Sequence, residues 1–171
     1  MLKRHWFIFL FLISFGIYLH AGDVMNYSGT WMLDESKMET GDGGPRMAAS
    51  KLTITQDAKQ ITIERFISSQ FRGDFTSTEN VTLDGKETNN TTDFGDRKMT
   101  ATWSDDKKVL TIKSVLEMNR DGQSFQMNST EIWTLMEDGN VLKIDQTRMS
   151  PRGERKSVLF YNKEKLSLIH I

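Results

Sequence analysis

The sequence predicts an all-β protein built as a single antiparallel up-and-down β-barrel of about 8–10 strands. From Ser28 onward, apolar residues recur at every second position, which is the period of a half-buried strand. Short turn signals separate nearly all of the strand-like runs, and turns this short join antiparallel neighbours as hairpins. Consecutive hairpins favour a barrel over a sandwich, because a sandwich needs Greek-key connections between its sheets.

The first 22 residues are expected to be a signal peptide. A basic start, including Lys3 and Arg4, precedes an apolar run over residues 7–19, and His20-Ala21-Gly22 supplies small residues for cleavage. A helix of thirteen residues spans about 20 Å, less than the ~30 Å hydrocarbon core of a bilayer. A retained membrane anchor is the alternative. The barrel is therefore expected over residues 23–165, exported to the periplasm or the medium, with no integral membrane segment after processing.

About ten strand-like runs follow, rich in Thr, Val, Ile and aromatic residues. In chain order they are residues 29–33, runs around Leu52–Ile54 and Ile61–Ile63, then 75–83, 87–91, 99–103, 109–118, 124–135, 141–149 and 155–161. A helical turn is expected around residues 34–38. The Gly-rich stretch 40–45 after it is the longest loop and the best candidate for a lid or mouth.

The last six residues, 166–171, are apolar and fit no strand alternation. They resemble the translation of a transposon mosaic-end sequencing adapter, and we exclude them from the fold as an artefact. A genuine terminal strand is the alternative.

Composition limits the chemistry of the protein. The histidines are His5, His20 and His170, so residues 22–165 contain neither His nor Cys. The usual zinc, copper, haem and iron–sulfur sites are thereby excluded, as are Ser-His-Asp and Cys-His catalytic arrangements. A net charge of −1 offers no electrostatic footprint for nucleic acid. We expect no cofactor, no metal and no nucleic-acid partner, while the sequence does not determine the oligomeric state.

Gly29-Thr30-Trp31, early in the first predicted strand, resembles the G-x-W motif of lipocalins and related calycins. The wider order SGTW, LTITQD, LDGKE, TATWSDD and EIWTL, from Ser28 to Lys163, resembles uncharacterised exported bacterial proteins with lipocalin-like domains. This resemblance implies a barrel like those of lipocalins and fatty-acid-binding proteins, with Gly29 and Trp31 as structural residues. It also implies a cation packed over Trp31, for which Arg148 and Arg155 are candidates. The chain differs from typical lipocalins in lacking Cys and a clear C-terminal helix.

Strand parity predicts which side chains face the lumen, since alternate residues of a strand point to the same face. Each central strand carries one or two polar groups on its apolar face. The candidate ligand-binding residues of the lumen are Arg65, Ser77, Glu79, Ser114, Phe125, Met127, Ser129, Glu131, Gln146 and Arg148.

Four of these residues form a charge-balanced set: Arg65, Glu79, Glu131 and Arg148. Buried charge is costly unless it is paired, so the four are expected either to pair or to line a wet cavity. A polar floor below an apolar wall would orient the head group of a ligand. A purely structural ion-pair network, or strands that turn these residues outward, are the alternatives.

Three functions follow from this reading. The first is an exported, non-enzymatic barrel that holds a small apolar or amphipathic molecule. The second is a structural or interaction module of the cell envelope with a filled core; a lumen below about 300 Å³ would favour it, because such a lumen has no room for a drug-sized ligand. The third, less favoured, is a hydrolase in which Glu79 and Glu131 act as paired carboxylates.

Overall fold

The computed structural model describes residues 24–41, 48–68, 73–120 and 122–165. The expected signal peptide, most of the Gly-rich stretch and the apolar tail lie outside these residues. The strands are β1 (Gly29–Leu33), β2 (Glu39–Thr40), β3 (Lys51–Gln56), β4 (Gln60–Ile67), β5 (Phe75–Thr82), β6 (Thr88–Thr92), β7 (Gly95–Trp103), β8 (Val109–Arg120), β9 (Gln123–Met136), β10 (Val141–Ser150) and β11 (Gly153–Lys163). Two single-turn 3₁₀ helices, η1 (Glu35–Lys37) and η2 (Glu137–Gly139), complete the described elements.

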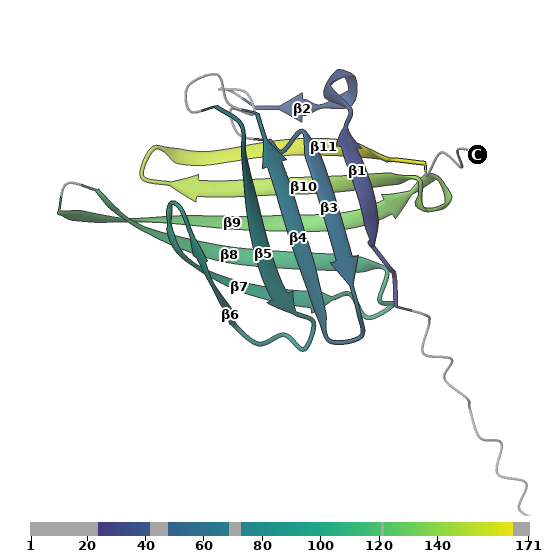
Figure 1. The fold of residues 1–171 in the computed structure, drawn as a ribbon, viewed down its shortest axis with the longest axis horizontal. Helices are drawn as coiled ribbons and strands as arrows, with labels where there is room; N and C mark the ends of the chain where they lie inside the picture. The colour runs from purple at the N-terminus through teal and green to yellow at the C-terminus, as the bar shows by residue number, and fades with distance from the viewer. Residues whose placement is uncertain (1–23, 42–47, 69–72, 121, 166–171) are drawn as a thin grey trace, which may run out of the picture.

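The strands form one antiparallel sheet that curls into a nearly closed barrel (Figure 1). The hydrogen-bonded order is β5-β4-β3-β1-β11-β10-β9-β8-β7-β6, so the first and last strands pair and neighbours in sequence are neighbours in space. In Figure 1, strands β3 to β5 form the front wall and cross the strands of the back wall at a steep angle. The up-and-down barrel predicted from the turn spacing is confirmed.

Short turns join the strands where the sequence predicts them. Between β1 and β2, the Asp34 carboxylate accepts a hydrogen bond from the backbone N–H of Ser36 and caps η1, which confirms the predicted helical turn. Gly95 begins β7 at a φ of 133°, and a Cβ there would collide with the carbonyl oxygen of Glu117 on β8. Glycine is therefore required for the close approach of these two strands.

Two expectations need correction. The short strand β2, which pairs with Val158 and Ser157 of β11, was not predicted, because two residues show no alternation. The cation over Trp31 is Lys163, whose Nζ lies 5.1 Å from the ring centroid, rather than Arg148 or Arg155. The reason is register: Trp31 and Lys163 are direct partners in the β1–β11 pair.

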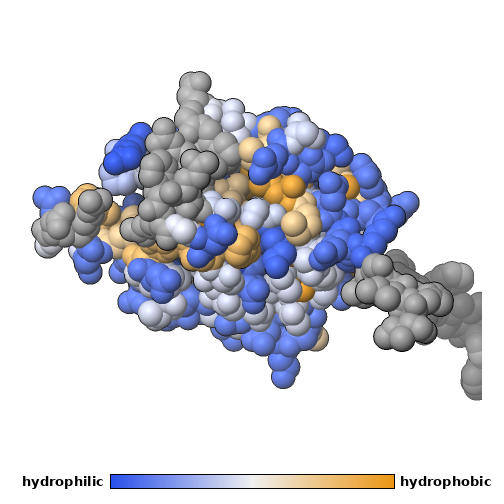
Figure 2. Space-filling model, turned by 45° about the horizontal axis from the view of Figure 1, so that its top comes forward, coloured by the Kyte–Doolittle hydropathy of each residue, from blue (hydrophilic) through white to orange (hydrophobic). Residues whose placement is uncertain are grey.

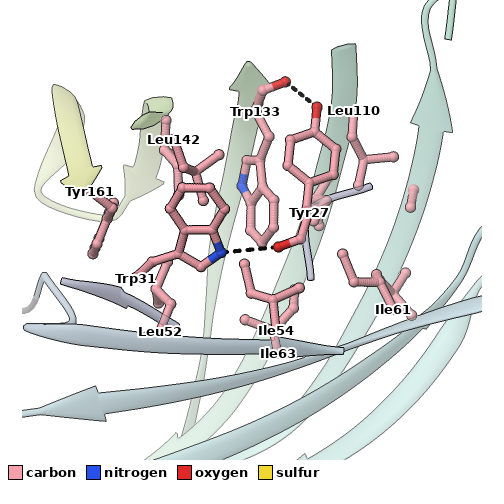
Figure 3. Packing of buried hydrophobic residues seen from close by; sticks show 14 of the residues in the cluster. Tyr27, Trp31, Leu52, Ile54, Ile61, Ile63, Leu110, Trp133, Leu142 and Tyr161 are labelled. Atoms are coloured by element: carbon pink, nitrogen blue, oxygen red, sulfur yellow. Dashed lines mark hydrogen bonds between the residues drawn. The ribbon is translucent and has the colours of Figure 1, made fainter. Parts of the chain in front are cut away.

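The apolar core fills one part of the barrel (Figure 3). Tyr27, Trp31 and Trp133 are fully buried, and the rings of Tyr27 and Trp133 meet edge to face at 5.6 Å. The hydroxyl of Tyr27 donates to the carbonyl of Trp133 at 2.8 Å, and the indole N–H of Trp31 donates to the carbonyl of Tyr27 at 3.0 Å. These bonds tie the segment before β1 to β1 itself and to β9 of the back wall.

Strands β5 and β6 lie side by side but share no backbone ladder. The side-chain amide of Asn90 replaces part of it: its Oδ1 accepts from the Asn80 N–H at 2.7 Å, and its Nδ2 donates to the Asn80 carbonyl at 2.9 Å. Closer to the turn that joins the two strands, the Thr82 N–H donates to Thr88 Oγ1 at 3.1 Å. We call this contact between β5 and β6 the seam.

Replacing Asn90 with Ala should weaken the seam. The change leaves the backbone N–H and carbonyl of Asn80 without their partners, and two lost hydrogen bonds cost about 1–3 kcal/mol. Urea denaturation should show this loss in the free energy of unfolding. Asn89→Ala, on the exposed side of the same strand, is the matched control and should change stability by less than about 0.5 kcal/mol. Equal effects of the two substitutions would contradict the role of Asn90.

Candidate functional site

A partly enclosed cavity of about 190 Å³ lies inside the barrel. Its apolar wall comes from β4, β5, β8 and β9 and from the turn between β6 and β7, and includes Ile67, Phe75, Phe94, Leu116, Met118 and Met127. Its polar floor consists of Arg65, Ser77, Glu79, Arg97, Ser114, Ser129, Glu131, Gln146, Arg148 and Tyr161. The barrel therefore combines a packed apolar part with a polar cavity.

Nine of the ten candidate lumen residues line this cavity. Phe125 does not. It precedes Asn128, the first residue of β9 that pairs with β10, by three positions, and it belongs to the β8–β9 hairpin, which projects from the barrel in Figure 1. Parity identifies the face of the strand on which Phe125 lies, but it does not show that β9 lacks a β10 partner at this position.

Arg65 on β4 links two buried carboxylates. Its Nε donates to Glu79 Oε2 on the neighbouring strand β5 at 3.2 Å, and its Nη2 donates to Glu131 Oε2 on β9 at 2.9 Å. Glu79 is fully buried and Glu131 is 6% exposed. Because β4 and β9 belong to opposite walls, the second bond crosses the lumen (Figure 1).

Both carboxylate oxygens of Glu131 are hydrogen-bonded to neighbouring side chains. Besides Arg65, the indole N–H of Trp133 donates to its Oε2 at 3.0 Å, and Nε2 of Gln146 donates to its Oε1 at 2.8 Å. Burial alone would raise the pKa of Glu131, but the charge of Arg65 and these hydrogen bonds outweigh it and lower the pKa to about 2. Glu131 is therefore ionised at neutral pH.

Glu79 takes its second cation from Arg97 on β7, whose Nη1 donates to Glu79 Oε1. The Nε of Arg97 is buried and has no hydrogen-bond partner in the described part of the chain. The predicted balance of two arginines and two glutamates is therefore wrong. With Arg97, the cavity holds three arginines and two glutamates. Strand alternation could have identified Arg97 as an inward-facing residue, because it has the same parity as the buried Met99 and Ala101. It was missed because the predicted strand began at residue 99.

Arg148 on β10 differs from the other two arginines. It lines the cavity but has no hydrogen bond or ion pair with any described residue. Burial, together with the positive charges of Arg65 and Arg97, lowers its pKa in spite of the nearby Glu131. The floor therefore holds one guanidinium whose charge is not neutralised by a direct partner.

Tyr161 was also missed as a lining residue, although it alternates with the buried Leu159 at the end of the last predicted strand. Its hydroxyl donates to the carbonyl of Ala49 at 3.0 Å, and burial raises its pKa. Elsewhere in the floor, the hydroxyls of Ser114 and Ser129 lie 2.9 Å apart on neighbouring strands.

The outer surface offers less. Figure 2 shows a mostly hydrophilic face on which some hydrophobic residues gather, and a shallower hollow of about 410 Å³ lies outside the barrel beside β2. Exposed apolar side chains are ordinary on protein surfaces. Among the described residues, no cluster of metal-binding side chains is found, and no helix is long and apolar enough to span a membrane. The internal cavity is therefore the candidate site.

No protein-family profile matches the chain, and no curated protein matches it. Among solved structures, the chain is similar to the zebrafish ileal bile acid-binding protein, which was crystallised with cholic acid. The two share 11% identity with a TM-score of 0.40, over 81% of this chain and 98% of that one. The nearly closed meander of ten strands, with Gly29 and Trp31 in β1, has the antiparallel up-and-down topology that the sequence predicts.

Arg65→Met should cost about 3–5 kcal/mol of unfolding free energy, because it leaves the buried Glu131 carboxylate without a bonded cation. Arg148→Met should cost less than about 1 kcal/mol, because Glu131 keeps Arg65, Trp133 and Gln146. Urea denaturation of both variants measures the difference. A cost for Arg148→Met as large as that for Arg65→Met would show that Arg148 holds a carboxylate.

Stability should fall in acid through Glu131. Its pKa drops on folding from an ordinary 4.5 to about 2, so its stabilising contribution is complete above pH 4.5 and is lost as the pH falls toward 2. The stability difference between the wild type and Glu131→Gln should therefore shrink over that window. Glu64→Gln, at an exposed position of β4, should follow the wild type throughout. A constant difference down to pH 2 would contradict the lowered pKa.

Proposed function

We propose that this protein is a non-enzymatic binding protein that holds a small amphipathic molecule in its barrel lumen. One observation carries the proposal: the cavity joins a buried polar floor to an apolar wall. Ligand sites in proteins commonly combine an apolar lining with a few placed polar groups that fix orientation. A head group would lie at the floor and an apolar body along the side chains of Leu116, Met118 and Met127.

The volume limits the ligand. About 190 Å³ is below the ~300 Å³ expected for a drug-sized site. It exceeds the ~150 Å³ of an engineered apolar cavity that binds benzene. The proposed ligand is therefore small, and a large lipid would not be enclosed.

The same volume favours a second candidate function, a barrel with a largely filled core that acts through its surface in the cell envelope. The two functions differ in what accompanies the purified protein. Native mass spectrometry of protein from its host should show a bound small molecule for the first, whereas a stoichiometric protein partner in a pull-down would support the second.

The paired carboxylates do not favour the hydrolase. Carboxylate-based glycoside hydrolysis needs a protonated carboxyl as general acid. Glu131, with a pKa lowered to about 2, is ionised at neutral pH, and Glu79 is bonded to two arginines. Both side chains act as partners of arginine in this geometry.

We further propose that the protein is exported, to the periplasm or the medium. The basic start and apolar run of residues 1–22 support this. N-terminal sequencing of the protein from its host should begin near Gly22 or Asp23. A start at Met1 would contradict export by signal cleavage.

A substitution that fills the cavity should abolish binding. Met118→Trp adds bulk at the apolar wall, whereas Val115→Trp adds the same kind of bulk on the outer face of the same strand. Displacement of a fluorescent small amphiphile should be lost in the first variant and kept in the second, with both variants folded by circular dichroism. Unchanged binding in Met118→Trp would place the ligand elsewhere.

A further inference from the structure

We infer that the ligand of the lumen is a small organic monoanion, such as a carboxylate of about six to ten non-hydrogen atoms, whose charged group binds Arg148. The inference rests on the proposed binding function and names the ligand class. It combines three properties of the cavity: its charge, its unpaired donors and its size.

The described part of the cavity carries one net positive charge. Arg65, Arg97 and Arg148 contribute three positive charges, whereas Glu79 and Glu131 contribute two negative ones. An isolated charge removed from water is costly unless a counter-charge neutralises it. Because arginine stays protonated, a bound anion is the means of neutralisation that the site allows. One excess charge calls for a monoanion.

Neither carboxylate of the floor forms a direct hydrogen bond or ion pair with Arg148, and both are already bonded to other described residues. Both oxygens of Glu79 are bonded, one to Arg65 and the other to Arg97. Both oxygens of Glu131 are also bonded, to Gln146 on one side and to Arg65 and Trp133 on the other. The Arg148 guanidinium therefore faces the cavity with its fork of donors unused by described residues, and such a fork matches the two oxygens of a carboxylate.

A second unpaired donor lies in the same floor. The Nε–H of Arg97 is buried and has no partner among the described residues. Buried polar groups in folded proteins are almost always hydrogen-bonded. A buried N–H group that lines a cavity and has no partner is therefore suited to bind an acceptor atom of a ligand. A bound anion supplies acceptors, whereas a hydrocarbon or a cationic ligand supplies none.

The apolar wall and the volume define the rest of the ligand. Phe75 and Phe94, whose rings meet edge to face at 5.5 Å, lie with Leu116 and Met118 along the wall. A bare inorganic anion would leave this wall in contact with water. A volume of about 190 Å³ accommodates a body near the size of benzene plus a head group.

The experiment is isothermal titration of the full-length protein with benzoate and hexanoate, each compared with its neutral counterpart, benzyl alcohol and 1-hexanol. Inorganic phosphate tests for a simple anion site. The proteins are the wild type, Arg148→Met, Arg148→Gln and the control Arg152→Met, which removes the same charge from the exposed β10–β11 turn. Hydrogen bonds between charged groups predict that the carboxylates bind the wild type at least about tenfold more tightly than the alcohols.

Arg148→Met and Arg148→Gln should lose this preference while still binding the alcohols, which also reports that they are folded. Arg152→Met should behave as the wild type. Equal affinity of the wild type for acids and alcohols would overturn the monoanion and leave the proposed binding function intact. The monoanion proposal would also be overturned if either folded Arg148 variant still preferred acids over alcohols. It would be overturned as well if phosphate bound the wild type as tightly as benzoate does. Absence of binding by both acids and alcohols would overturn the binding function itself.

Discussion

The hydrogen-bonded ion pair between Arg65 and Glu131 is the interaction on which the interior of this barrel depends. It joins β4 of the front wall to β9 of the back wall across the lumen at 2.9 Å, and the same guanidinium also binds Glu79. A buried carboxylate without a cation is expensive, so each wall supplies the charge that the other requires.

This arrangement divides the interior into two parts. Toward the segment that precedes β1, Tyr27, Trp31 and Trp133 fill the space with aromatic rings and satisfy their own polar atoms through backbone carbonyls. Beyond Glu131, the strands bring serines, arginines and Gln146 inward, and a cavity remains. Trp133 belongs to both parts, since its ring packs on Tyr27 and its N–H binds Glu131. The packed part thus supports the position of the polar floor.

The seam between β5 and β6 lies next to this cavity. Phe75 of β5 and Phe94 just after β6 both line it, while Asn80 and Asn90 bind each other where the strands run close. A side-chain amide carries the same donor and acceptor as a peptide group, which explains how the wall is completed without a ladder. The part of the barrel wall that has no backbone ladder therefore borders the candidate site.

The sequence by itself determined the fold class, the order of the strands and the inward faces of most of them. A period of two identifies which side chains share a face, and short turns leave antiparallel neighbours as the simplest connection. That is why nine of the ten candidate residues line the cavity. The alternation of residues does not reveal the stagger between neighbouring strands or the position of each residue along the barrel axis. Both are set when the sheet closes into a barrel.

Only the tertiary structure therefore decided which charges meet, that Arg97 joins them, that Phe125 does not line the cavity and that Lys163 covers Trp31. It also decided that Arg148 has no direct ion pair among the described residues, whereas Glu131 is bonded by side chains from three different strands.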